Sequence, residues 1–288
     1  MKRLLVILLV LGLLLSGAGL AMGGNNPVYF ENGWVHVQKK DVKTLNVTDP
    51  LRFVELDVRV SEADVTLVSG DSFSIDARYE DGQTPQYSLD DGVLSVFDDG
   101  GIQHRSYLIS GLSFTSLTRN NRITITLPRD VRLDSASVRI SLGDMWVDGL
   151  SASLFTARSS MGGLNIKRVV ADVFTATANM GQIHAEDVKA TNARFEADMG
   201  DATLMKLSTD GLVVIDKMGD VNVGGALRGV SSVHTNMGSV SVKTELPRAS
   251  YAELRAKTDM GDAREPLMGQ GVAVTGTNHL TATSNMGD

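Results

Sequence analysis

Apolar and polar residues alternate along much of the first half of the chain, which is the pattern of β-strands with one buried face. The alternating segments are residues 53–60, 64–68, 72–79, 93–97 and 122–128. Turn-forming sequences, Ser69-Gly70-Asp71 and Asp90-Asp91-Gly92, separate some of these segments. The first half is therefore expected to consist of short strands, with a long loop over residues 98–121, where little pattern remains.

The second half is built on a repeat of 19 residues that is marked by the pair Met-Gly. The pair begins at Met161, Met180, Met199, Met218 and Met237. Leu142-Gly143-Asp144 is a degenerate copy before them, and copies at Met260 and Met286 follow with spacings of 23 and 26 residues. A short fixed period is typical of solenoid proteins, in which each repeat packs only against its neighbours.

Alignment of the copies on the methionine shows where the apolar positions lie. The residue four places before the methionine is apolar in every copy: Val138, Ala157, Ala176, Phe195, Val214, Val233, Ala256 and Ala282. The third and fifth residues after it are apolar until Glu265 breaks the pattern. Alternation on both sides of a glycine predicts short strands joined at a tight corner. We therefore expect an all-β fold, a β-solenoid of about 19-residue coils that follows a β-rich capping region.

The methionines fall in phase with the apolar column that precedes them. We therefore expect them to form a ladder through the core, where a flexible thioether tolerates imperfect stacking. The alternative is that Met-Gly-Asp is a binding motif.

The first residues have the order of an export signal. Lys2 and Arg3 are followed by an aliphatic run from Leu4 to Leu15 and then by small residues up to Ala21. Cleavage after Ala21 is favoured; the alternative is an uncleaved anchor, because about 17 apolar residues approach the length that spans a bilayer. Either way the rest of the chain is exported, to the cell surface, the extracellular space or the outer side of the cytoplasmic membrane.

Three regions are expected from these patterns. Residues 1–22 are a signal peptide or N-terminal anchor, residues 23–136 a β-rich region that caps or starts the solenoid, and residues 137–288 the solenoid repeats.

Composition excludes several classes of function. The 288 residues carry a formal charge of −7 without a basic cluster, which argues against a nucleic acid partner. The chain has no cysteine, which excludes disulfides, thiolate metal sites and a cysteine nucleophile. The five histidines are far apart in sequence, so no zinc-type pair is expected.

Together these features resemble the bacterial "putative adhesin" family, exported β-strand-repeat proteins labelled historically as a domain of unknown function. The resemblance is carried by Ser69-Gly70-Asp71, the strands at 92–96 and 123–128, and the repeated Gly-Asp turns, and it covers about residues 50–288. It implies a right-handed β-solenoid at the cell surface or in the envelope, with no catalytic residues.

The residue after the repeat glycine is often acidic. It is Asp144, Asp201, Asp220, Asp262 or Asp288 in five copies, and Gly163, Gln182 or Ser239 in the others. This mixture favours a turn role, in which the aspartate accepts backbone N–H bonds. A second interpretation is catalytic, because stacked Asp201 and Asp220 would lie about 5 Å apart, as in retaining glycosidases. A third is calcium binding, with Asp198, Asp201 and Asp220 as weak candidates, although Lys217 beside Asp198 would offset charge. No catalytic residue and no cofactor site are assigned.

Three functions remain. The first is a non-catalytic envelope solenoid that acts as an adhesin or scaffold and binds an envelope glycan or a surface protein. The second is a carbohydrate-active enzyme that uses the stacked aspartates. The third is a self-associating structural protein of the envelope, joined through open solenoid ends.

Overall fold

The structure is a computed structural model that describes residues 28–31, 34–37, 42–48, 51–80, 84–98, 121–260 and 276–287. The expected export segment and nearly all of the loop at 98–121 lie outside the described residues. What is described is β-structure apart from one short 3₁₀ helix, η1 (Arg248–Ser250). No helix in these ranges is long and apolar enough to cross a bilayer.

The strands divide into an N-terminal group and a repeat group. The N-terminal strands are β1 (Val28–Glu31), β2 (Trp34–Val37), β3 (Val42–Val47), β4 (Glu55–Glu62), β5 (Asp64–Gly70), β6 (Ser74–Glu80), β7 (Pro85–Asp90), β8 (Val93–Asp98) and β9 (Arg122–Pro128). The repeat strands are β10 (Leu133–Leu142), β11 (Met145–Asp148), β12 (Ser151–Met161), β13 (Leu164–Met180), β14 (Ile183–Met199), β15 (Ala202–Met218), β16 (Val221–Met237), β17 (Val240–Thr244), β18 (Tyr251–Met260) and β19 (Asn278–Met286). All of them except β1 and β2 belong to one sheet of 17 strands.

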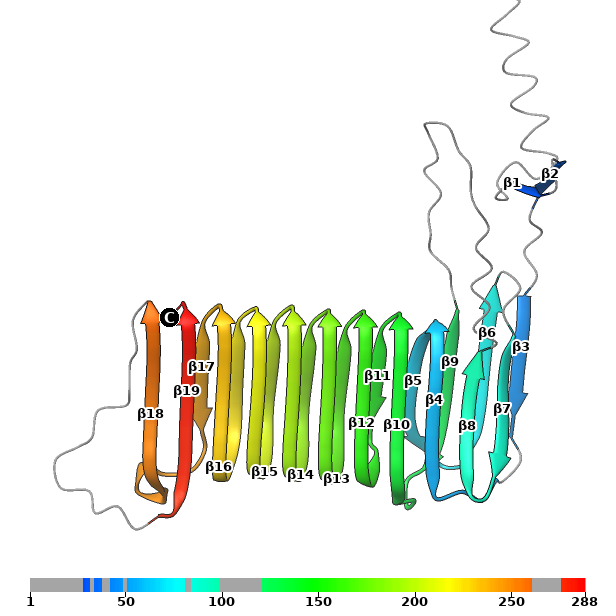
Figure 1. The fold of residues 1–288 in the computed structure, drawn as a ribbon. Coiled ribbons are helices and arrows are strands. Elements are labelled where there is room, and N and C mark those ends of the chain that lie inside the picture. The colour runs from blue at the N-terminus through cyan, green and yellow to red at the C-terminus, as the bar shows by residue number, and fades with distance from the viewer. Residues whose placement is uncertain are drawn as a thin grey trace, which may run out of the picture.

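Each repeat makes one coil, and the coils stack in parallel. Leu164 pairs with Ile183, Ile183 with Ala202, and Ala202 with Val221, so that neighbouring coils are offset by one 19-residue repeat. Figure 1 shows β10 and β12 to β16 side by side, with every arrowhead at the same edge of the rod. The predicted β-solenoid is confirmed.

The coils built from β13 and β14 bend twice between their glycine corners. The pairing of β13 with β14 omits Arg168 and Asp172, and the alternation of buried and exposed residues changes phase at both positions. Arg168, Asp187 and Lys206 occupy the first bend in three successive coils, and each has a positive φ of 50° to 54°. Only a few per cent of non-glycine residues adopt this conformation, which here turns the chain from the first segment of the coil into the second.

The core lies between the faces of the coil. The predicted apolar column four residues before each methionine is buried from Val138 to Val233. The Phe174 ring packs between those of Phe155 and Phe195, with centroids 5.2 and 5.0 Å away. This stack fills the middle of the rod with bulky rings at positions where other coils carry smaller residues.

The N-terminal strands continue the parallel stack and then end it with antiparallel strands. β10 pairs in parallel with β4 and β11 with β5, while β8 and β9 extend these two faces further. Beyond them β6 and β7 pair in antiparallel fashion with β9 and β8, and β3 pairs with β6. Asp91 and Gly92, both at positive φ, form the tight β7–β8 turn predicted from the sequence. Antiparallel strands thus cap this end of the solenoid.

The expectation for the methionines is wrong. Met180 is 44% exposed and Met199 43%, and the methionines of the other coils are exposed to a similar degree. Phe174, Ala176 and Ala178 are buried, so strict alternation along a straight strand would also bury Met180. The chain instead turns away at Gly181, whose φ is 153°, and so Met180 lies on the outside of the corner.

Candidate functional site

The acidic turns form a chain of hydrogen bonds between successive coils. The Oδ1 atom of Asp201 accepts the backbone N–H of Asp220 at 2.9 Å, and Asp220 in turn accepts that of Ser239 at 2.8 Å. In the same way, the carboxylate of Asp64 accepts the backbone N–H of Asp144, and the carboxylate of Asp144 accepts that of Gly163. Each carboxylate satisfies a corner N–H of the next coil, which supports the turn interpretation.

The structure does not bring the three candidate calcium ligands together. Asp201 and Asp220 lie in successive coils of the turn column, whereas Asp198 forms an ion pair with Lys217 at 2.7 Å. In the described ranges, no group of three or more His, Asp or Glu side chains is arranged to hold a metal ion. Calcium binding by these residues stays an untested prediction.

A different aspartate, Asp216, lies inside the rod. Its side chain is fully buried, and neither carboxylate oxygen has a partner of hydrogen-bond geometry. The equivalent residues of the following coils, Thr235 and Ser284, donate their hydroxyls to corner carbonyls of Gly219 and Gly238. A protonated Asp216 carboxyl could donate in the same way, but a carboxylate could not.

Burial raises the pKa of Asp216 to about 6, from the 3.8 that is usual for an exposed aspartate. The negative charges of Asp201 and Asp198 raise the pKa further, while the nearby N–H groups of Met218 and Lys217 lower it and offset part of the effect. A buried carboxyl with such a pKa is a common mark of a catalytic acid. Asp216 has no exposed surface, however, so a substrate cannot reach it in this conformation.

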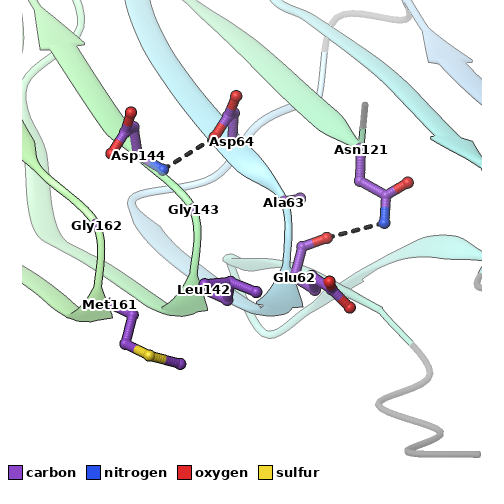
Figure 2. Close-up of a pocket in the computed structure, with 9 residues that line it drawn as sticks. All are labelled: Glu62, Ala63, Asp64, Asn121, Leu142, Gly143, Asp144, Met161 and Gly162. Atoms are coloured by element: carbon purple, nitrogen blue, oxygen red, sulfur yellow. Dashed lines mark hydrogen bonds between the residues drawn. The ribbon is translucent and has the colours of Figure 1, made fainter. Parts of the chain in front are cut away.

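A hollow of about 370 Å³ lies over the glycine corner where the N-terminal strands meet the repeats. Figure 2 shows Asp64 and Asp144 on one side of this corner and Leu142 and Met161 on the other. The Asp64 carboxylate is bound to the N–H of Asp144, and the Asn121 side chain donates to the carbonyl of Glu62 at 2.9 Å. Because these polar groups are already used to hold the corner, the hollow offers few free ones to a ligand.

Three arginines form a row on the long face of the first coils. Arg59 of β4 pairs in register with Arg139 of β10, and Arg139 pairs with Arg158 of β12. Adjacent strands lie about 4.8 Å apart, so three guanidinium groups emerge within about 10 Å. We call Arg59, Arg139 and Arg158 the arginine row.

The arginine row borders a depression of about 590 Å³. Its lining includes Ser61, Asp98, Ser141 and Ser160 in addition to the three arginines. These side chains give the depression guanidinium and hydroxyl donors, the groups that bind carboxylate, sulfate or phosphate oxygens.

The depression keeps a positive charge although two acidic residues lie near it. Asp57 pairs with Arg59 at 2.5 Å and with Arg139 at 3.4 Å. Asp98 is almost buried, and both of its carboxylate oxygens accept hydrogen bonds from Ser61 or Tyr79, so that they are occupied within the protein. Arg158 forms no ion pair within the described part of the chain.

Sequence reasoning missed the arginine row. Arg139 and Arg158 are 19 residues apart, so the repeat alone could have placed them in one column. Arg59 could not be found in this way, because β4 joins the stack from a segment outside the regular period.

The fold and these surfaces define a class of protein: a capped β-solenoid whose stacked coils present regular polar faces. Residues 53–288 match the model of the family described as Toastrack DUF4097, and the chain belongs to that family. None of the curated proteins compared with the chain matches it significantly.

Several solved structures are similar to this chain at low identity. A "putative adhesin" from Bacteroides fragilis is 14% identical, with a TM-score of 0.43 over 86% of this chain and 98% of its own. A "putative cell adhesion protein" from Clostridium sporogenes is 10% identical, with a TM-score of 0.26 over 86% and 97%. A "putative lipid binding protein" from Parabacteroides distasonis is 12% identical, with a TM-score of 0.38 over 72% and 97%. At these scores the likeness carries no argument about ligand or activity.

Proposed function

We propose that this protein is a non-catalytic, exported binding protein of the bacterial envelope, and that its arginine row holds an acidic glycan. The observation that carries the proposal is the convergence of Arg59, Arg139 and Arg158 on one depression of about 590 Å³. An adhesin-like role at the cell surface agrees with the export signal expected from residues 1–22.

An acidic polymer fits this surface better than a neutral one. Guanidinium groups bind carboxylates, sulfates and phosphates through paired N–H donors, and a row of three can follow successive charges of a polymer. The chain as a whole is acidic, with a charge of −7. A positive row on an acidic molecule directs an anionic ligand to that place.

Binding of matched polysaccharides tests the proposal. Carboxylated, sulfated and neutral glycans of similar length would be titrated against the purified protein by calorimetry at low and at physiological salt. We expect the acidic glycans to bind and the neutral ones not to, with affinity falling as salt screens the charges. The double variant R139Q/R158Q is expected to bind at least about tenfold more weakly.

The matched control is R194Q/R255Q, which removes two exposed arginines that pair with Glu196 and Glu253 elsewhere on the rod. The proposal fails if neutral glycans bind equally well or if both double variants bind like the unchanged protein. Sizing the recovered glycan by mass tests catalysis in the same experiment, because shortened chains would point to an enzyme and to Asp201 and Asp220.

A further inference from the structure

Seven methionines stand next to one another along one edge of the rod. In spatial order they are Met161, Met180, Met199, Met218, Met237, Met286 and Met260, each paired in register with the next. Each is the last residue of its strand, so the row follows the arrowheads at the upper edge in Figure 1. We call these seven residues the methionine ladder.

The methionine ladder is exposed to a uniform degree. From Met161 to Met286 the exposed fractions lie between 41% and 45%, and only Met260 is more exposed, at 62%. Core packing therefore does not explain why this position carries methionine.

The ladder is too narrow to serve as an apolar docking face. The residue before each methionine is polar, as with Asn179, Asp198 and Lys217, and the residue after it is a glycine. The apolar stripe is thus one residue wide. What the column repeats without interruption over seven coils is the thioether sulfur.

Thioethers are soft ligands that prefer soft monovalent ions such as Cu(I) over Mg²⁺ or Ca²⁺. Metal–sulfur bonds in proteins measure about 2.3 Å, so two sulfurs on opposite sides of one ion lie about 4.6 Å apart. Parallel strands hold neighbouring methionines about 4.8 Å apart. The spacing of the coils therefore matches the spacing that two sulfur ligands of one ion need.

We propose that the methionine ladder binds Cu(I) and the chemically similar Ag(I), with each ion held between the sulfurs of adjacent coils. Seven sulfurs in one row provide overlapping pairs, so that an ion can move from one pair to the next. The sites are independent of the arginine row, because they lie at the glycine corner and use different side chains.

The first test follows the methionine methyl signals by NMR while Ag(I) is added to the whole protein. Signals from the ladder are expected to shift, whereas those of Met205 and Met145 should not. Met205 is 44% exposed but lies outside the ladder, and Met145 is buried, so the two control for exposure and for global change. Equal shifts at Met205 and the ladder, or no shifts at all, would overturn the proposal.

The second test separates adjacent sulfurs from mere sulfur content. Leucine has nearly the volume of methionine and these positions are exposed, so the variants are expected to fold. The alternating triple variant M180L/M218L/M286L leaves no two ladder sulfurs side by side. The terminal triple variant M161L/M180L/M199L removes as many sulfurs but keeps four in a row.

Cu(I) affinity would be measured without oxygen by competition with a chromophoric chelator. The alternating variant is expected to lose at least about tenfold in affinity, and the terminal variant to keep the affinity while binding fewer ions. If the two variants behave alike, binding between adjacent coils is disproved.

Discussion

At position 216 a carboxyl occupies a column that neighbouring coils fill with alanine or a hydroxyl. Ala197 precedes Asp216 in the stack and Thr235 follows it. The carboxyl is buried, and its pKa is raised to about 6. In this column a neutral donor fits and a charge does not.

The raised pKa makes stability depend on pH in a defined direction. The folded state holds the proton more tightly than the unfolded state, so this group destabilises the fold as pH rises from about 4 to about 6, and the loss then stays constant. The variant D216N is expected to remove this dependence and to be more stable at pH 7.5 by up to about 3 kcal/mol. Urea unfolding of both proteins at pH 4 and pH 7.5 measures the difference.

Exposed Asp220 provides the control for that measurement. It accepts a backbone N–H at the turn, so D220N is expected to lower stability modestly at pH 7.5 instead of raising it. If D216N and the unchanged protein lose stability in parallel between the two pH values, the buried carboxyl is not the cause.

At the scale of the element, the glycine corner sets how closely the coils stack. A Cβ atom on Gly181 would lie 2.2 Å from the carbonyl oxygen of Gly162, and the φ of Gly181 is 153°. In the next coil, a Cβ atom on Gly200 would lie 2.5 Å from the carbonyl oxygen of Gly181. The corner residue therefore cannot carry a side chain without opening the stack.

The variant G181A is expected to destabilise the protein by roughly 3 kcal/mol or more, through the close contact and the strained φ. Gly163 gives a matched control. A Cβ there would make only ordinary contacts at 3.6 Å, so G163A is expected to be neutral or slightly stabilising. Thermal melts of the two variants compare them directly, and equal melting temperatures would contradict the role given to the corner.

Strands and corners were largely predictable from the sequence, but the orientation of the corner residues was not. Alternation placed β4, β5 and the buried columns correctly because it reports local burial in straight segments. It failed at Met180, because the bend that exposes this residue depends on the coil beneath. It also gave no sign that β19 lies between β16 and β18, since that order follows from pairing distant segments.

At the scale of the whole molecule, each coil touches only its two neighbours, so coils should be removable as units. Deletion of residues 183–201 joins Gln182 to Ala202, which already occupies the position of Ile183 in the next coil. We expect this variant to fold, to melt at a lower temperature and to keep acidic glycan binding, because the arginine row is untouched.

Deletion of only residues 183–192 is the counterpart, because it breaks the 19-residue register. We expect that variant to lose the cooperative melt seen by circular dichroism. Two variants that melt alike would show that the stack does not depend on register.

For the candidate sites the sequence was less informative, since Arg59 reaches the arginine row only through the three-dimensional order of the coils.

The stacking geometry also determines how far the molecule reaches. One coil uses 19 residues to advance the rod by about 4.8 Å, whereas the same residues fully extended would span about 60 Å. The length of the rod is therefore set in small units: each coil gained or lost over evolution changes the distance between its two ends by about 4.8 Å. The same change adds or removes one side chain in every surface column, so the length of the rod and its number of binding positions change together.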